Sequence, residues 1–349
     1  MTQRGGTAVR SDEDTQRDLR TLAKELDISF DEAVQRFGDQ HAFYDVLDEV
    51  RTIDPDVVVR AEWREGSGVI YVQDQLLPAV VEIVAHSEVE VRGAAAIGEA
   101  TQSALVEDLS AELTKFGQKA FVASYDWNTT TVLVETFGSP IVDSETLMKQ
   151  SALASRLHVS LTIRESGDSA PAPAARGGMK YSNCTGGFIA KQGTERVIVT
   201  ARHCDTKPAT YDAATTGTTV VTSSSDLRKT SLVGTAHGPG FRRDLGLWTS
   251  ATSYGDPAFG GYVCKFGTTT NNTCSVVEAT GLCVKYAEWP QFCGIFRTMS
   301  DIVDPGDSGG PAFNGGRALG ITSGHSPGQT SFFTQISRLS GLGVTVVTG

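Results

Sequence analysis

The sequence has no uninterrupted apolar run of membrane-spanning length, which argues against an integral membrane protein. Its first residues lack the apolar stretch of a secretory signal and are instead charged and polar, for example Arg4 and Arg10. The first half of the chain has no cysteine at all. None of the six cysteines in the second half forms a C-x-x-C pair, which argues against a zinc site.

The cysteines that are present are Cys184, Cys204, Cys264, Cys274, Cys283 and Cys293. An even number confined to one half of the chain indicates disulfides and an oxidising compartment. We therefore expect a secreted protein whose signal peptide is not part of this sequence. No metal and no other cofactor is expected.

Positive charge is scarce in the first half of the chain. Residues 1–178 hold 16 basic and 30 acidic residues, whereas residues 179–349 hold 14 basic and 11 acidic residues. The net charge of −11 argues against nucleic acid as the main partner. Opposite charges on the two halves are compatible with halves that bind each other, but on charge alone two independent solvated surfaces are the favoured interpretation.

The composition changes at residues 166–178, which are small, contain proline and show no periodicity. This stretch predicts an exposed linker and a target for cleavage, although an ordinary tether between domains would have the same composition. It divides the chain into a first unit, residues 1–165, and a second unit, residues 179–349.

The first unit is predicted to be an α+β region with two α-β-β-α-β repeats, in which Trp63 and Trp127 end matching strands. The expected helices are 13–37, 43–50, 77–85, 104–116 and 145–157, and the expected strands 57–63, 69–72, 89–92, 120–127, 132–135 and 159–163. The second unit has many short β-branched stretches between Gly-rich turns, which predicts an all-β barrel or sandwich. Its expected strands include 188–190, 197–200, 218–222, 245–248, 276–279 and 343–347.

Three segments of the second unit offer an imidazole, a carboxylate and a hydroxyl: Thr-Ala-Arg-His203-Cys, Arg-Asp244-Leu-Gly-Leu-Trp and Asp-Pro-Gly-Asp-Ser308-Gly-Gly-Pro. A serine hydroxyl needs a base to become nucleophilic, and a carboxylate fixes the tautomer of that base. Asp244 stands before an apolar stretch and is the expected carboxylate. Its nearest rival is Asp226, which lies in a Ser-rich loop.

These segments resemble those of the chymotrypsin-fold serine proteases, in particular the secreted bacterial streptogrisins and alpha-lytic protease. Cys184-Thr-Gly-Gly-Phe, Cys264-Lys-Phe-Gly-Thr and Leu319-Gly-Ile-Thr-Ser-Gly match that family as well. The resemblance covers residues 179–349. It implies two six-stranded antiparallel barrels with the active site in the cleft between them.

By position, the resemblance makes His203 the general base, Asp244 its orienting carboxylate and Ser308 the nucleophile. The backbone amides of Gly306 and Ser308 would form the oxyanion hole. The substrate cleft would be lined by Ser323, Gly324 and His325.

The resemblance also implies the disulfides Cys184–Cys204, Cys264–Cys274 and Cys283–Cys293, with other pairings left open by the sequence. It suggests that the first unit is a propeptide that assists folding, inhibits the protease and is removed. The family usually has a small residue where Arg202 stands and often has a disulfide around the nucleophile loop that is absent here.

The predicted function is therefore a serine endopeptidase made as a zymogen, whose partners are protein or peptide substrates and its own N-terminal region. Ile302 stands where a trypsin-like pocket would carry an acid, so medium-sized apolar side chains are the expected preference. His325 could narrow the pocket or favour an acidic side chain. A latent or non-catalytic binding protein, and an esterase with the same three residues, are the alternatives.

Overall fold

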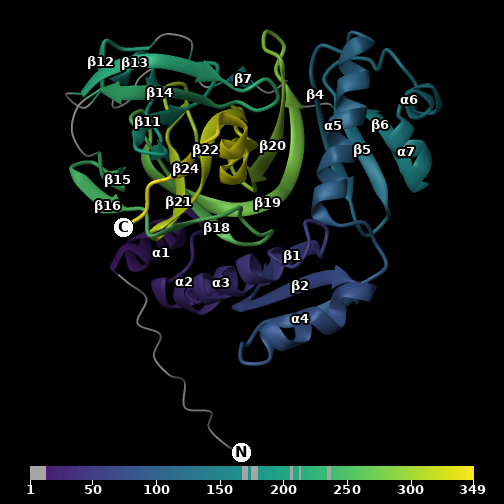
Figure 1. The fold of residues 1–349 in the computed structure, drawn as a ribbon, viewed down its shortest axis with the longest axis horizontal. Coiled ribbons are helices and arrows are strands. Elements are labelled where there is room, and N and C mark those ends of the chain that lie inside the picture. Colours follow the sequence, from purple (N-terminus) through teal and green to yellow (C-terminus); the bar gives the residue numbers. More distant parts are fainter. Residues whose placement is uncertain (1–12, 167–171, 174–179, 205–206, 212–213, 234–236) are drawn as a thin grey trace, which may run out of the picture.

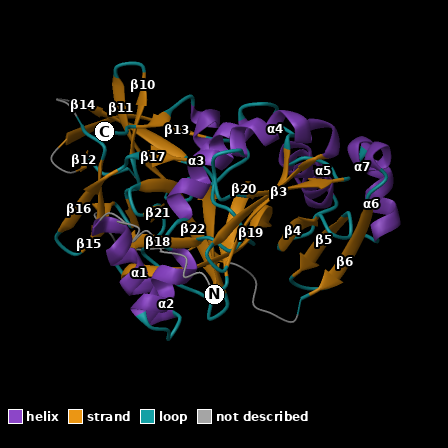
Figure 2. Cartoon of the chain, turned by 90° about the horizontal axis from the view of Figure 1, so that it is seen from below, coloured by secondary structure: helices purple, strands orange, loops and turns teal. Residues whose placement is uncertain are grey.

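The computed structural model describes residues 13–166, 172–173, 180–204, 207–211, 214–233 and 237–349. Helices gather in the N-terminal half and strands dominate the C-terminal half, which the N-terminal half borders along two sides (Figures 1 and 2). Most of the predicted linker lies outside the described residues. No helix in these ranges is both long and apolar enough to cross a lipid bilayer.

The first part of the N-terminal half is three helices followed by a small sheet. Helix α2 begins where Ser29 accepts a hydrogen bond from the backbone N–H of Glu32 at 3.1 Å, a capping interaction typical of helix starts. Strands β1 and β2 are antiparallel, and β3 runs parallel to β2. The elements are α1 (Glu13–Glu25), α2 (Phe30–Phe37), α3 (Gln40–Arg51), β1 (Val58–Arg64), β2 (Ser67–Gln73), a 3₁₀ turn (Asp74–Leu76), α4 (Leu77–Val84) and β3 (Glu90–Ala94).

The next part has α5 (Glu99–Lys115), β4 (Phe121–Asp126), β5 (Thr131–Thr136), α6 (Ser144–Gln150), α7 (Ala152–Leu157) and β6 (Ser160–Glu165). The single helix predicted over 145–157 is wrong, because Ser151 interrupts it. The backbone of Ser151 is extended, and its hydroxyl accepts a hydrogen bond from the N–H of Ala154 at 2.9 Å, which starts α7.

One six-stranded sheet of the C-terminal half has the order β12-β13-β14-β11-β10-β24. Two short antiparallel pairs lie beside it. The strand predicted over 245–248 is wrong, since Leu245 and Gly246 form the turn between β15 and β16, where Gly246 has a φ of +71°. The strands are β8 (Lys180–Tyr181), β9 (Cys184–Thr185), β10 (Ile189–Gln192), β11 (Glu195–Thr200), β12 (Thr210–Tyr211), β13 (Ala214–Val221), β14 (Arg228–Val233), β15 (Gly240–Asp244), β16 (Leu247–Ser250) and β24 (Thr345–Val346).

The other large sheet continues across both halves of the chain, in the order β18-β21-β22-β23-β20-β19-β4-β5-β6. Strand β4 pairs with β19 through Val122 and Val284, and the edge of β22 also carries β17 and β7. The remaining elements are β7 (Ala172–Pro173), β17 (Ser253–Tyr254), β18 (Tyr262–Gly267), β19 (Asn271–Lys285), β20 (Gln291–Thr298), β21 (Pro311–Asn314), β22 (Arg317–Ser326), β23 (Thr330–Gln335) and a 3₁₀ helix (Ile336–Leu342).

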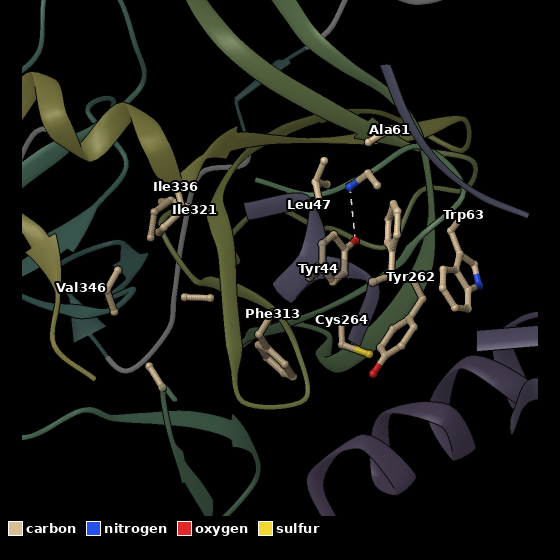
Figure 3. Close-up of a cluster of buried hydrophobic side chains, with 14 of the residues drawn as sticks. Tyr44, Leu47, Ala61, Trp63, Tyr262, Cys264, Phe313, Ile321, Ile336 and Val346 are labelled. Carbon is tan, nitrogen blue, oxygen red and sulfur yellow. Dashed lines mark hydrogen bonds between the residues drawn. The ribbon is translucent and has the colours of Figure 1, made fainter. Parts of the chain in front are cut away.

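The largest apolar core also includes residues from both halves (Figure 3). Tyr44 and Trp63 come from the first half, and Tyr262 and Phe313 come from the second, and all four are at most 5% exposed. The hydroxyl of Tyr44 accepts a hydrogen bond from the backbone N–H of Ala258 at 3.2 Å. Burial of large aromatic side chains is a major source of stability, so the two halves stabilise each other.

Candidate active site

His203 lies at the turn that follows β11, and Ser308 lies in the glycine-rich loop that precedes β21. Although they are far apart in the sequence, His203 Nε2 is 2.8 Å from Ser308 Oγ. Ser308 is fully buried and His203 is 6% exposed. The disulfide between Cys184 and Cys204 fixes the residue that follows the histidine.

The carboxylate that contacts the histidine belongs to Asp226. Its Oδ2 is 2.7 Å from His203 Nδ1, and its Oδ1 accepts the backbone N–H of His203 at 3.1 Å. The prediction that Asp244 orients His203 is therefore wrong. Asp244 ends β15 next to the exposed turn at Leu245, and its side chain accepts the backbone N–H of that residue at 2.7 Å.

Asp226 lies in the serine-rich loop between β13 and β14, which folds inward rather than into solvent. The backbone N–H of Thr222 donates to the carbonyl of Leu227 at 3.1 Å, so the loop closes on itself and Asp226 is fully buried. The sequence signal around Asp226, a leucine that follows it and a nearby β-strand, is the same as that around Asp244, so it does not separate the two.

Ser323 contributes to the same network from β22. Its hydroxyl donates to Asp226 Oδ2 at 2.7 Å and accepts from the hydroxyl of Tyr286 at 3.0 Å. Burial raises the pKa of Tyr286 above its ordinary value, so this phenol stays protonated and remains a donor. The Ser323 hydroxyl, itself held by the Tyr286 hydroxyl, therefore fixes the position of the Asp226 carboxylate.

A buried ion pair supports the loop that carries Ser308. Lys265 Nζ lies 2.9 Å from Asp307 Oδ2, and both side chains are fully buried. Burial raises the pKa of the Asp307 carboxyl, but the Lys265 ammonium and the hydrogen bonds from Thr270 and Asp304 outweigh it and hold that pKa below its ordinary value. Asp307 therefore stays ionised and anchors the residue next to Ser308.

Glycine is required where this loop meets its neighbours. Gly309 has a φ of +80°, and a Cβ there would lie 2.4 Å from the carbonyl oxygen of Thr185. The carbonyls of Gly306 and Ser308 accept hydrogen bonds from the Thr185 hydroxyl and backbone N–H, at 3.0 and 2.7 Å. Among the described residues, none accepts from the backbone N–H of Gly306 or Ser308, so both donors are free to bind an anionic oxygen.

The three residues predicted to line a substrate cleft lie together on β22, beside Ser308. The hydroxyl of Ser323 faces Asp226, and His325 Nδ1 lies 3.0 Å from Asp301 Oδ2. Arg202 donates to the backbone carbonyl of Thr222 at 2.9 Å, so its guanidinium holds the Asp226 loop and does not contact Ser308.

The structure joins the cysteines as Cys184–Cys204, Cys264–Cys274 and Cys283–Cys293, in agreement with the pairs that the resemblance implies. The described residues include a cluster of Cys184, Cys204 and His203, but its two sulfurs form a disulfide and supply no thiolate for a metal.

This arrangement has the chemistry needed for acyl transfer. The imidazole can take the proton of Ser308 through Nε2 while the carboxyl group of Asp226 orients and stabilises the imidazole ring through Nδ1. The two free amide groups at Gly306 and Ser308 can stabilise a negative oxygen on the attacked carbonyl.

Comparison with known proteins agrees with this chemistry. No protein-family model matches the chain. Streptogrisin-A of Streptomyces griseus is 30% identical over 261 residues, which cover 71% of this chain and 85% of streptogrisin-A. Glutamyl endopeptidase 2 of the same organism is 31% identical over 177 residues, covering 47% of this chain and 93% of that protein.

Streptogrisin-D, also from Streptomyces griseus, is 32% identical over 179 residues, which cover 44% of this chain. The chain spans about two-fifths of the length of streptogrisin-D and streptogrisin-C. Among solved structures, Thermobifida fusca protease A has a TM-score of 0.43 and 30% identity over 51% of this chain and 96% of its own. A glutamic acid specific serine protease has a TM-score of 0.42 and 26% identity over 50% of this chain and 97% of its own.

The match to streptogrisin-A extends over 85% of that protein at 30% identity. The chain belongs to the streptogrisin group of chymotrypsin-fold bacterial serine proteases.

Proposed function

We propose that the protein is a serine endopeptidase in which Ser308 is the nucleophile, His203 the general base and Asp226 the orienting carboxylate. The observation that carries this proposal is the chain of two short contacts, Ser308 Oγ to His203 Nε2 at 2.8 Å and His203 Nδ1 to Asp226 Oδ2 at 2.7 Å. Both contacts are buried, where hydrogen bonds to charged groups are stronger than in water.

The reaction proceeds in two halves. Ser308 Oγ bonds to the carbonyl carbon of the peptide while its proton passes to His203, and the C–N bond breaks as His203 gives that proton to the departing amine. A water molecule then attacks the ester by the same route and frees Ser308. The amides of Gly306 and Ser308 hold the oxyanion in both halves.

The chain is proposed to be a secreted zymogen with a pro-region at 1–165, a linker at 166–178 and a protease domain of two barrels at 179–349. Charge complementarity supports binding between the pro-region and the protease domain. Arg243 pairs with Asp14 at 2.6 Å and also with Asp18, and Arg317 pairs with Asp48 at 2.7 Å. Neither nucleic acid nor a membrane is a proposed partner.

The contact between the pro-region and the protease domain supports a folding role for the pro-region. Strand β4 pairs with β19 and so offers an already formed strand edge to the β19–β20 hairpin. The Cys283–Cys293 disulfide joins the two strands of that hairpin. Pairing of distant strands is slow because the chain must close long loops first, so a preformed edge lowers that barrier. The two α-β-β-α-β units of the pro-region would each present a strand or a helix for this purpose.

The experiment is labelling with an active-site-directed phosphonate, followed by turnover of peptide and short-ester substrates. Wild type should become labelled at Ser308 and cleave peptides, while Ser308→Ala should do neither. Labelling with ester turnover alone would favour the esterase. A folded wild type that is not labelled, before or after removal of residues 1–178, would show a non-catalytic protein.

A further inference from the structure

The loop between β20 and β21 is fastened by side chains rather than by strand pairing. All of its residues, 299–310, are described, and they form no helix and no strand. Its backbone groups therefore need other partners. The N–H of Ile302 donates to Ser331 Oγ at 2.8 Å, and the N–H of Val303 donates to Asp301 Oδ1 at 3.3 Å.

Asp301 accepts hydrogen bonds from several segments around this loop. Its Oδ2 lies 3.0 Å from Nδ1 of His325 on β22 and accepts the backbone N–H of Gly328, in the turn between β22 and β23, at 2.8 Å. Its Oδ1 accepts from the hydroxyl of Ser331 on β23 at 2.9 Å. Gly328 and Ser331 thus orient the carboxylate, and the carboxylate in turn holds the ring of His325.

The contact between Asp301 and His325 is strong because the carboxylate is charged and largely shielded from water. The side chain of Asp301 is 13% exposed and that of His325 is 7% exposed. Burial raises the pKa of the Asp301 carboxyl, but the hydrogen bonds from His325 and Gly328 outweigh it and hold that pKa below its ordinary value. Hydrogen bonds to an ionised group in such a place are stronger than those between neutral groups.

No disulfide fastens the loop to the neighbouring strands. The three disulfides account for all six cysteines, and none of them joins residues 299–310 to β22 or β23. Charged contacts take this place at both ends of the loop. Asp307 pairs with Lys265 at one end, and Asp301 contacts His325 at the other.

The part of β22 that Asp301 holds has one side on which an extended peptide can bind. On its other side, His325 opposes Ser331 of β23. Ala172 of β7 opposes His325 on the first side, so this edge of β22 accepts an added strand. Thr322, three residues earlier, accepts the N–H of Gly309 at 2.8 Å, so the same strand lies against the nucleophile loop. A peptide on this edge meets the nucleophile correctly only if the strand is held in place.

We propose that Asp301 is a positioning residue for peptide binding, which holds His325 and thereby the substrate-binding part of β22 in place beside Ser308. This inference rests on the proposed function. Asp301 acts on how tightly a peptide binds, while bond formation and proton transfer stay with the three residues described above.

The same contacts exclude Asp301 as a free receptor for a basic side chain of the substrate. Its two oxygens already accept from a ring N–H, a hydroxyl and two backbone N–H groups. A carboxylate has about four sites for accepted hydrogen bonds, so a Lys or Arg side chain would have to displace one of these donors. Asp301 therefore reaches the substrate only through His325.

The kinetics of Asp301→Asn separate peptide binding from chemistry. The new amide has one acceptor oxygen in place of two and no charge. For a peptide p-nitroanilide, KM should rise about tenfold or more while kcat stays within about twofold, because a hydrogen bond to a charged group is lost outside the reacting atoms. For p-nitrophenyl acetate, which offers no side chain to the cleft, kcat/KM should not change. Both are measured on the enzyme obtained from the full-length chain.

Two further variants test the route through His325. Glu195→Gln removes one negative charge at the exposed start of β11 and should change neither KM nor kcat. In the His325→Ala background, Asp301→Asn should raise KM by less than about twofold, because the contact is already absent. A tenfold increase in that background would show that Asp301 does not act through His325.

Backbone hydrogen exchange tests the same contact without any need for activity. In the full-length Ser308→Ala chain, residues 325–328 should exchange about tenfold faster or more with Asp301→Asn than with Glu195→Gln. Unchanged exchange there would overturn the inference. Exchange that rises throughout the C-terminal half would also overturn it, because the variant would then lower overall stability.

The remaining outcomes separate this inference from the proposed function. An equal loss of kcat with both substrates would show lost folding rather than lost positioning. An effect confined to peptides with Lys or Arg before the cleaved bond would make the carboxylate a receptor. Either result overturns the inference and leaves the endopeptidase intact. A wild type that turns over neither substrate, or the ester alone, would overturn both proposals.

Discussion

At the scale of single residues, two aspartates compete for the same role, and their burial separates them. Asp226 is fully buried and bonded to His203, whereas Asp244 is partly exposed at the end of a hairpin strand. A carboxylate stabilises an imidazolium most strongly where water is excluded, so only Asp226 is placed to raise the reactivity of Ser308.

Replacement of each aspartate tests this assignment. Asp226→Asn should lower kcat for a peptide substrate by about 10⁴-fold, because the amide favours the wrong tautomer of His203. Asp244→Asn should leave kcat almost unchanged. Both are measured on the processed protease at saturating substrate; a large loss in Asp244→Asn with activity retained in Asp226→Asn would contradict the observed contact.

Lys265 and Asp307 form the second residue-scale feature. Asp307 also accepts the backbone N–H groups of Thr269 and Thr270, at 2.9 and 3.2 Å. The buried ion pair and these two hydrogen bonds thus join the Ser308 loop to β18 and to the turn that follows β18.

Loss of one member of this ion pair should lower the free energy of unfolding much more than loss of both members. In the Ser308→Ala background, Lys265→Met should lower the free energy of unfolding by about 3–5 kcal/mol, since it leaves the buried charge of Asp307 unpaired. The double variant Lys265→Met with Asp307→Asn should recover part of this loss. The free energies of unfolding of the single and double variants are measured by urea unfolding. Lys191→Met, at an exposed lysine, serves as the control. Equal effects of Lys265→Met and Lys191→Met would refute the prediction.

At the scale of elements, helix α1 contributes charge to the surface of the C-terminal half. Asp18 on α1 accepts from the backbone N–H of Gly315 at 2.7 Å and contacts Arg243, and the side chains of Asp18 and Arg243 are fully buried. Arg243 lies over the ring of Phe313 at 5.3 Å, so the helix covers both a charge and an apolar core residue.

This contact should decide how tightly the N-terminal half stays bound after cleavage. Asp18→Asn should weaken binding by about 2–5 kcal/mol, because Arg243 keeps its charge in a buried position with one partner fewer. Glu145→Gln on α6, whose carboxylate is exposed and pairs with Lys149, should have no effect. The measurement is co-elution of the two fragments in gel filtration across protein concentration. Equal retention in both variants would show that α1 does not hold the complex.

At the scale of the whole molecule, the two halves share one sheet and one core. The continuous ladder through β19 and β4, and the core of Tyr44, Trp63, Tyr262 and Phe313, join the two halves through both backbone hydrogen bonds and apolar contacts. The C-terminal half alone would have a free edge at β19 and apolar groups without partners.

Refolding should therefore depend on the N-terminal half. The purified C-terminal fragment with intact disulfides should regain its near-UV circular dichroism at least about tenfold more slowly than full-length Ser308→Ala, because its strand pairs are mostly distant in sequence. Addition of the separate N-terminal fragment should restore the rate, and serum albumin at the same concentration should not. Equal rates without any addition would contradict a folding role.

The sequence by itself determined much of this protein. The motifs at His203 and Ser308 indicated the family and predicted the candidate site, because the chemistry needs those residue types in glycine-rich turns of a recognisable order. Periodicity located most helices and strands of the first half, since the α-helix and the β-strand have fixed repeats, but it merged α1 with α2 and α6 with α7. The disulfides that the family resemblance implied are those found in the structure.

Only the tertiary structure decided the rest. The choice of Asp226 over Asp244 depends on which loop folds inward, and burial of a short polar loop leaves no periodic signal in the sequence. The pairing of β4 with β19 and of β7 with β22 joins segments more than a hundred residues apart, and strand registers across such distances are set by packing and by the edges left free. The candidate residues His203 and Ser308 were therefore readable from the sequence, whereas Asp226 and the strand pairings between the two halves were determined by the fold.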